Sequence, residues 1–122
     1  MKRILVIDDD KKIREIFERF LGDHGYAVIC AKDGIDGLRL LRTESPDLVV
    51  TDIMMPNTDG LEVVLAMRDE FPAIPVIAIS GGMSASSMNF LPLAKKFGAC
   101  RILYKPVELD GFLSAVKEVL GK

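Results

Sequence analysis

Apolar residues along the chain form short unbroken runs, and these runs alternate with stretches in which apolar residues recur every three or four positions. An unbroken run of apolar, mostly β-branched residues is typical of a strand buried on both faces. Apolar residues that recur every three or four positions are typical of one face of a helix. The runs predict five strands, at residues 4–7, 26–30, 48–51, 75–79 and 101–104. The spaced stretches predict five helical faces, at residues 13–21, 34–44, 61–70, 90–97 and 109–120, and Ile16 and Ile35 are expected on the apolar faces of the first two.

The strict alternation of strand and helix defines the fold class. Parallel strands need helical crossovers, so five such units predict an α/β three-layer doubly wound sandwich, in which helices cover both faces of a five-stranded parallel sheet. The sequence contains no repeat, linker or low-complexity segment, so residues 1–122 are expected to form one domain with no output domain in this chain.

Composition narrows the function classes. Of the 122 residues, 49% are hydrophobic and 28% are charged, and the formal net charge is −2. This balance allows a sizeable core and gives no bulk electrostatic reason to bind nucleic acid or an anionic membrane. The sequence has neither a signal-peptide pattern nor an apolar run near the ~20 residues of a spanning helix, which predicts a cytoplasmic protein. Cys30 and Cys100 are expected to be reduced thiols in apolar surroundings.

Polar side chains follow four of the predicted strands at the point where each strand ends: Asp8 and Asp9, Asp52, Ser80, and Lys105. The carboxyl ends of parallel strands share one edge of the sheet, which is where ligands of such folds bind. Clustered carboxylates repel one another unless a cation lies among them, and Mg²⁺ is the first choice for a site of few carboxylates and several waters. An ammonium and a hydroxyl on the same edge would suit a phosphoryl group.

Asp10 is expected to have a different role from its two acidic neighbours. It stands where the first helix begins, so we interpret it as the helix N-cap, worth about 1 kcal/mol. Asp59 is interpreted in the same way as the N-cap of the third helix, with Glu62 as its partner.

Four motifs at matching intervals carry a resemblance to a known family: VIDDD, TDIMMPNTDG, ISGG and YKP. Together they resemble the receiver domain of two-component response regulators of the chemotaxis type, over essentially the whole chain. The resemblance implies the flavodoxin-like strand order 2-1-3-4-5 and a role in bacterial phosphorelay signalling. It also implies a monomer or weak dimer that binds neither nucleic acid nor membrane directly.

The resemblance implies a role for each motif residue. Asp52 is similar to the phospho-accepting residue, which is also expected to bind the metal. Asp8 and Asp9 resemble the acidic pair that binds Mg²⁺, with Asp9 contacting the metal more directly, and the backbone carbonyl of Met54 resembles a further ligand.

Ser80 and Lys105 resemble the hydroxyl and the lysine that contact the phosphoryl group. The peptide bond from Lys105 to Pro106 is expected to be cis, and Asp59 and Gly60 match structural positions of the family motif.

The implied function is phosphoryl transfer from a phosphohistidine onto Asp52. The donor would be a sensor histidine kinase or a histidine phosphotransfer protein. The phosphorylated domain would switch the loop and helix after Ser80 to control an effector or a fused output domain. It would catalyse its own phosphorylation and dephosphorylation, and would not be a turnover enzyme on a separate substrate.

Two features depart from the family pattern. The usual switch aromatic, three residues before the lysine, is replaced by Ile102, and the aromatic Tyr104 stands next to the lysine instead. The segment after Ser80 is longer than usual and contains Pro92, which predicts a lengthened loop and a short or kinked fourth helix.

Three alternatives stay open at this point. A haloacid-dehalogenase-type phosphatase would use Asp8 as nucleophile and Asp10 as its partner, but Lys11 and Lys12 do not fit its motif. A flavodoxin-like nucleotide binder is disfavoured because no glycine-rich phosphate loop follows any strand. A degenerate receiver would serve only as an interaction module, and failure to bind Mg²⁺ would favour it.

Overall fold

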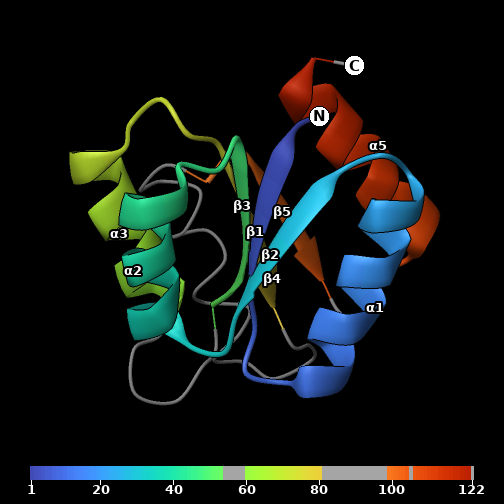
Figure 1. Cartoon of the computed structure of the whole chain (residues 1–122), viewed down its shortest axis with the longest axis horizontal. Helices are drawn as coiled ribbons and strands as arrows, with labels where there is room; N and C mark the ends of the chain where they lie inside the picture. The colour runs from blue at the N-terminus through green and yellow to red at the C-terminus, as the bar shows by residue number, and fades with distance from the viewer. Residues whose placement is uncertain (54–59, 81–98, 105, 122) are drawn as a thin grey trace.

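The computed structural model of the chain describes residues 1–53, 60–80, 99–104 and 106–121 (Figure 1). Five parallel strands form one sheet in the order β2-β1-β3-β4-β5, so the predicted order is confirmed. The strands are β1 (Arg3–Ile7), β2 (Ala27–Ala31), β3 (Leu48–Asp52), β4 (Val76–Ser80) and β5 (Arg101–Tyr104). The helices in the described ranges are α1 (Lys11–Asp23), α2 (Gly34–Glu44), α3 (Gly60–Glu70) and α5 (Leu109–Leu120).

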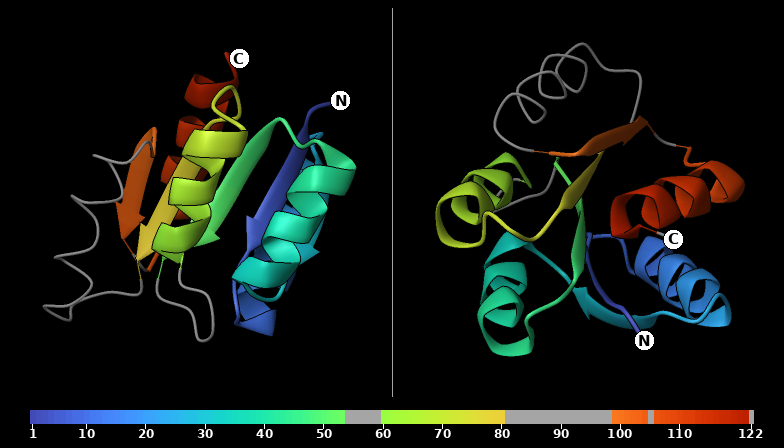
Figure 2. Two further views of the ribbon diagram at one scale, coloured as in Figure 1. Left: turned by 90° about the vertical axis from the view of Figure 1, so that its left-hand side faces the viewer. Right: turned by 90° about the horizontal axis from the view of Figure 1, so that it is seen from above.

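The helices cover both faces of the sheet, as the alternation predicts. Seen along the layers in Figure 2, α1 and α5 lie on one face and α2 and α3 lie on the other. The predicted fourth helix, at residues 90–97, lies outside the described residues. No helix within the described ranges is long and apolar enough to cross a membrane.

Alternate residues of the central strands supply two separate cores. Ile4 and Val6 of β1 belong to the core beneath α1 and α5, whereas Leu5 and Ile7 belong to the core beneath α2 and α3. All four are fully buried, because successive side chains of a strand point to opposite faces and both faces are covered. This is why β1 is an unbroken apolar run.

Two aspartates begin helices in the described part of the chain. The Asp10 side chain accepts a hydrogen bond of 2.9 Å from the backbone N–H of Lys12, which confirms its predicted role as N-cap of α1. Asp33 caps α2 in the same way by accepting from the backbone N–H of Asp36 at 2.8 Å.

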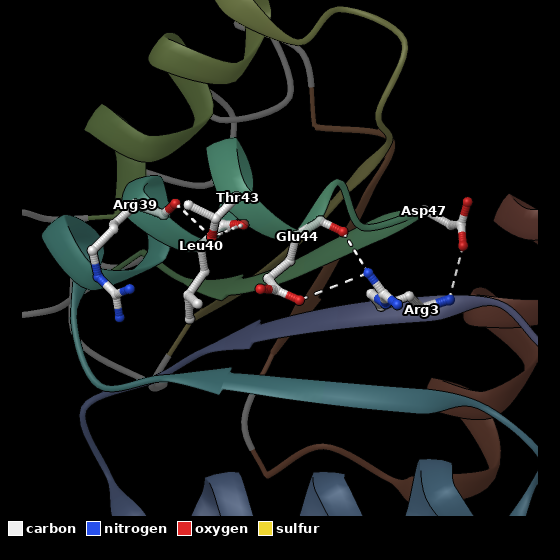
Figure 3. Close-up of polar contacts among 6 residues, drawn as sticks. All are labelled: Arg3, Arg39, Leu40, Thr43, Glu44 and Asp47. Atoms are coloured by element: carbon white, nitrogen blue, oxygen red, sulfur yellow. Dashed lines mark hydrogen bonds and ion pairs between the residues drawn. The ribbon is translucent and has the colours of Figure 1, made fainter.

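The amino edge of the sheet is tied to the end of α2 through Arg3 (Figure 3). The Arg3 guanidinium donates to the backbone carbonyl of Glu44 at 2.7 Å, and its backbone N–H donates to the Asp47 carboxylate at 2.8 Å. A cation at a helix C-terminus satisfies carbonyls that have no intrahelical partner and is favoured by the helix dipole. These bonds join β1 to the end of α2 and to the residue before β3, at the edge opposite the acidic motif.

Three residues that were expected to be buried are exposed, and the first is Ile16 on α1, at 48%. Ile35 was expected on the apolar face of α2 and is 64% exposed. The buried stripe of this helix contains Gly34, Gly37 and Leu41, and Ile35 lies about 100° around the helix from Gly34. Cys100 was expected in an apolar slot and is exposed, whereas Cys30 is partly buried.

The close packing of α2 on β1 gives a testable prediction at Gly37. A Cβ at this position would overlap the side chain of Ile7, with Cδ1 nearest and Cγ1 at 2.9 Å. Gly37→Ala gains about 1 kcal/mol of helix propensity and loses roughly 1–3 kcal/mol to overpacking of the buried Ile7. We expect a net loss of about 1 kcal/mol in the free energy of unfolding, measured by urea denaturation.

Gly111 in α5 supplies the matched control. No described atom lies within 4 Å of a Cβ added there, so Gly111→Ala is expected to stabilise the protein by up to about 1 kcal/mol. Equal shifts of the urea midpoint in the two variants would contradict the close approach of Gly37 to Ile7.

The two thiols are expected to differ in reactivity. Burial, with a smaller contribution from the negative charge of Glu18, raises the pKa of Cys30 to about 11. At pH 8 its thiolate fraction is then roughly 100-fold below that of an ordinary thiol, and the thiolate is the nucleophile. Iodoacetamide followed by peptide mass spectrometry should find Cys100 alkylated first. A Cys100→Ser variant that still reacts at the wild-type rate would refute this expectation.

Candidate functional site

The acidic residues Asp8 and Asp52 are brought together by the pairing of β1 with β3. Ile7 pairs with Thr51 in the parallel register, so the next residues, Asp8 and Asp52, lie side by side at the carboxyl edge of the sheet. Both are buried, with exposures of 2% and 4%, because the helices on either side cover the central strands. Residues 44 positions apart in the sequence therefore share one site.

Asp9 completes a cluster of three acids. One carboxylate oxygen each from Asp8, Asp9 and Asp52 lie within 4.8 Å of one another, and Asp9 is exposed. Asp10, which caps α1, is not part of this group. Of the three consecutive aspartates, Asp8 and Asp9 thus lie in the cluster and Asp10 caps the helix.

Hydrogen bonds hold the chain at Asp8 in place. Its backbone N–H donates to the carbonyl of Ala31 on β2 at 3.1 Å, and its Oδ1 accepts from the backbone N–H of Asp10 at 2.9 Å. The side chain of Asp8 is therefore oriented by the same turn that starts α1.

The donor set of this cluster suits a hard divalent cation. Two buried carboxylates beside each other are costly in a medium of low dielectric unless positive charge compensates them. Mg²⁺ takes few carboxylate ligands and keeps several of its waters, and the exposed Asp9 shows that the cluster reaches solvent. The residues present therefore fit Mg²⁺, with Asp8, Asp9 and Asp52 as the described candidates to hold it.

The remaining predicted site residues are described only in part. Ser80 is the last residue of β4 and pairs with Tyr104 of β5, so its backbone lies at the same edge of the sheet. Gly60 is the first residue of α3. The other predicted features lie outside the described residues: the Ser80 side chain, Met54, Asp59, Lys105 and the peptide bond between Lys105 and Pro106.

The two positions that depart from the family's switch pattern lie on β5. Ile102 is half-buried and packs against the small cluster of Ile53, Ala78 and Ala99, as expected of an ordinary strand residue. Tyr104 is 55% exposed at the strand end. The packing of Ile102 and the exposure of Tyr104 are both those of ordinary strand residues.

Arg14 is a residue of the site that sequence reasoning missed. Its guanidinium Nη1 donates to the backbone carbonyl of Asp8 at 2.7 Å. The only sequence signal is a basic residue one helical turn after the N-cap Asp10, and such residues are common on solvated helix faces.

The fold and the cluster together define a doubly wound α/β protein with an acidic, cation-compatible site at the carboxyl edge of its sheet. The family described as "Response regulator receiver domain" matches residues 4–117. The chain therefore belongs to the response regulator receiver domain family, and the resemblance of its motifs is confirmed.

Known relatives agree with this family. The chain is 37% identical over 120 residues to the response regulator MprA of Mycobacterium sp. (strain KMS), and 36% identical to that of Mycobacterium ulcerans. These matches cover 98% of this chain and about half of each relative, 51% and 50%. The chain thus spans about half the length of the curated relatives that it matches.

Solved structures show the same architecture. A response regulator receiver domain protein from Clostridium thermocellum superposes with a TM-score of 0.91 at 29% identity, covering 99% of this chain and 95% of that chain. A CheY-like receiver domain protein from Methanospirillum hungatei gives 0.90 at 30% identity, covering 99% and 94%.

Family membership settles the general class of function. The chain is a receiver domain of the two-component type, a signalling module rather than a turnover enzyme. The membership also argues against the phosphatase and the nucleotide-binding alternatives, whereas a degenerate receiver would still belong to the family.

Proposed function

We propose that this chain accepts a phosphoryl group on Asp52, with Mg²⁺ as cofactor and a phosphohistidine as donor. The observation that carries the proposal is the buried Asp52 carboxylate, which has an oxygen within 4.8 Å of oxygens of Asp8 and Asp9. Receiver-family membership makes this carboxylate the candidate acceptor, because Asp52 is the last residue of β3 and belongs to the TDIMMPNTDG motif.

The chemistry required of Asp52 is a nucleophilic displacement at phosphorus. An Asp52 oxygen would bond to phosphorus while the bond from phosphorus to the donor imidazole nitrogen breaks, and the electron pair leaves with that nitrogen. Mg²⁺, when bound, would neutralise negative charge on the transferring group. Asp8, Asp9 and Asp52, and the backbone carbonyl of Met54, are the groups proposed to hold it.

Ser80 and Lys105 are proposed to stabilise the phosphoryl oxygens. A hydroxyl and an ammonium are suitable donors for an anion whose charge develops during transfer. Ser80 is supported by its place at the end of β4, and Lys105 by its place directly after β5. A cis peptide bond before Pro106 and structural roles for Asp59 and Gly60 remain part of the proposal.

The biological setting follows from the family. We propose a sensor histidine kinase or histidine phosphotransfer protein as donor, and autodephosphorylation of Asp52 as the reset. The signal would pass through the segment after Ser80 to a downstream effector or a fused output domain. The greater length of the MprA relatives is compatible with a fused output. The expected compartment is the cytoplasm, with residues 1–122 acting as the receiver.

The direct test is intact-mass spectrometry after incubation with phosphoramidate, with and without Mg²⁺. A single phosphoryl adduct that requires Mg²⁺ supports the proposal. Absence of both the adduct and Mg²⁺ binding, measured by calorimetry, would instead identify a degenerate receiver that serves as an interaction module.

A further inference from the structure

Three of the hydrogen bonds that hold the turn between β1 and α1 involve the single residue Asp8. Its backbone N–H is bonded to Ala31 of β2, its Oδ1 to the N–H of Asp10, and its carbonyl to the Arg14 guanidinium. The bond from Arg14 is charge-assisted, is 2.7 Å long and is partly buried, which makes it a strong member of this set.

The backbone of Arg14 also contacts the neighbouring strand β2. Its backbone carbonyl lies 3.9 Å from the Sγ of Cys30, the residue before Ala31 on β2. Its backbone N–H bonds to the carbonyl of Asp10 at 3.1 Å within the first turn of α1. Three contacts therefore connect α1, the end of β1 and β2 to one another: Arg14 with Asp8, Asp8 with Ala31, and Cys30 with Arg14.

We propose that Arg14 is a positioning residue for the cation site, which holds the Asp8 carbonyl so that the Asp8 and Asp9 carboxylates keep their ligating arrangement. The inference rests on the proposed binding of Mg²⁺ by the acidic cluster. Groups that orient metal ligands through hydrogen bonds typically change metal affinity 10–100-fold when they are removed.

Loss of the Arg14 hydrogen bond and loss of the Arg14 charge are expected to change Mg²⁺ affinity in opposite directions. Removing a cation from the neighbourhood of a site that binds Mg²⁺ would by itself strengthen binding, because two positive charges repel. Removing the hydrogen bond to Asp8 would loosen the turn and weaken binding. The direction of the change therefore separates the two effects.

The experiment compares Arg14→Met with Arg19→Met by calorimetric Mg²⁺ titration at constant ionic strength and 25 °C. Arg19 is an exposed residue of the same helix, so its variant controls for the loss of one positive charge. We expect the dissociation constant of Arg14→Met to rise by at least about tenfold and that of Arg19→Met to stay within about twofold of wild type. Circular dichroism verifies that both variants are folded.

A second readout needs no metal. The amide resonance of Asp10, whose N–H donates to Asp8 Oδ1, should shift and exchange with solvent faster in metal-free Arg14→Met than in Arg19→Met. If Arg14→Met does not fold, Arg14→Lys is used, and a smaller change in the same direction is expected.

The outcomes keep this inference separate from the proposed function. Unchanged or tighter Mg²⁺ binding in the Arg14 variant, with normal binding in wild type, overturns the positioning role alone. Absence of Mg²⁺ binding in wild type defeats the proposed function. In that case the Asp10 amide still decides whether Arg14 orders the turn, and an unchanged resonance would overturn the inference.

Discussion

Asp52→Asn is expected to abolish the Mg²⁺-dependent phosphoryl adduct and to leave the fold intact. The amide is nearly the same size as the carboxylate, so the buried end of β3 keeps its packing. An amide nitrogen or oxygen is a far poorer nucleophile toward phosphorus than a carboxylate oxygen. The variant also removes one of three clustered negative charges, so its stability in metal-free buffer should equal or exceed that of wild type.

Intact mass and urea denaturation measure the two parts of this prediction, and Asp8→Asn is the informative companion. Loss of Asp8 should weaken Mg²⁺ binding and slow adduct formation, with Asp52 still the modified residue when Mg²⁺ is raised. Donor hydrolysis that survives in Asp52→Asn and fails in Asp8→Asn would refute the receiver mechanism and favour the phosphatase that uses Asp8 as nucleophile.

Phe112→Ala is expected to cause the largest loss of stability. The ring is 0% exposed in the core beneath α1 and α5, and its centroid lies 4.6 Å from that of Phe17 and 6.5 Å from that of Phe20. Truncation removes the transfer free energy of the ring and leaves a cavity between two helices and the sheet. We expect a loss of about 3–5 kcal/mol in the free energy of unfolding, a large part of the total for a small domain.

Urea denaturation measures this loss, and Phe20→Ala serves as the control. Phe20 belongs to the same aromatic group but is only partly buried, so its truncation should cost clearly less. Equal losses in the two variants would mean that Phe112 does not occupy the centre of this core.

The sequence alone was enough to predict the fold and the edge of the sheet at which the candidate site lies. Strand runs and helical spacing carry separate periodicities, so β1 through β5 and the described helices were found within a residue or two of their ends. Polar residues at the ends of apolar strands must meet at the carboxyl edge of a parallel sheet, which is why the sequence placed Asp8, Asp9 and Asp52 at one edge, where their carboxylate oxygens lie within 4.8 Å of one another. The cap at Asp10 was predictable because capping depends on the adjacent turn alone.

Other features depended on contacts between segments far apart in the chain, and only the tertiary structure decided them. Ile35 fits a helical apolar pattern, yet α2 packs on the sheet through the stripe that contains Gly37, close to Ile7, and Ile35 faces solvent. Arg14 looks like any helix-surface cation until the packing of α1 places its guanidinium on the Asp8 carbonyl. Local periodicity determines which elements form, whereas the rotation and depth of each packed helix determine which side chains reach the site.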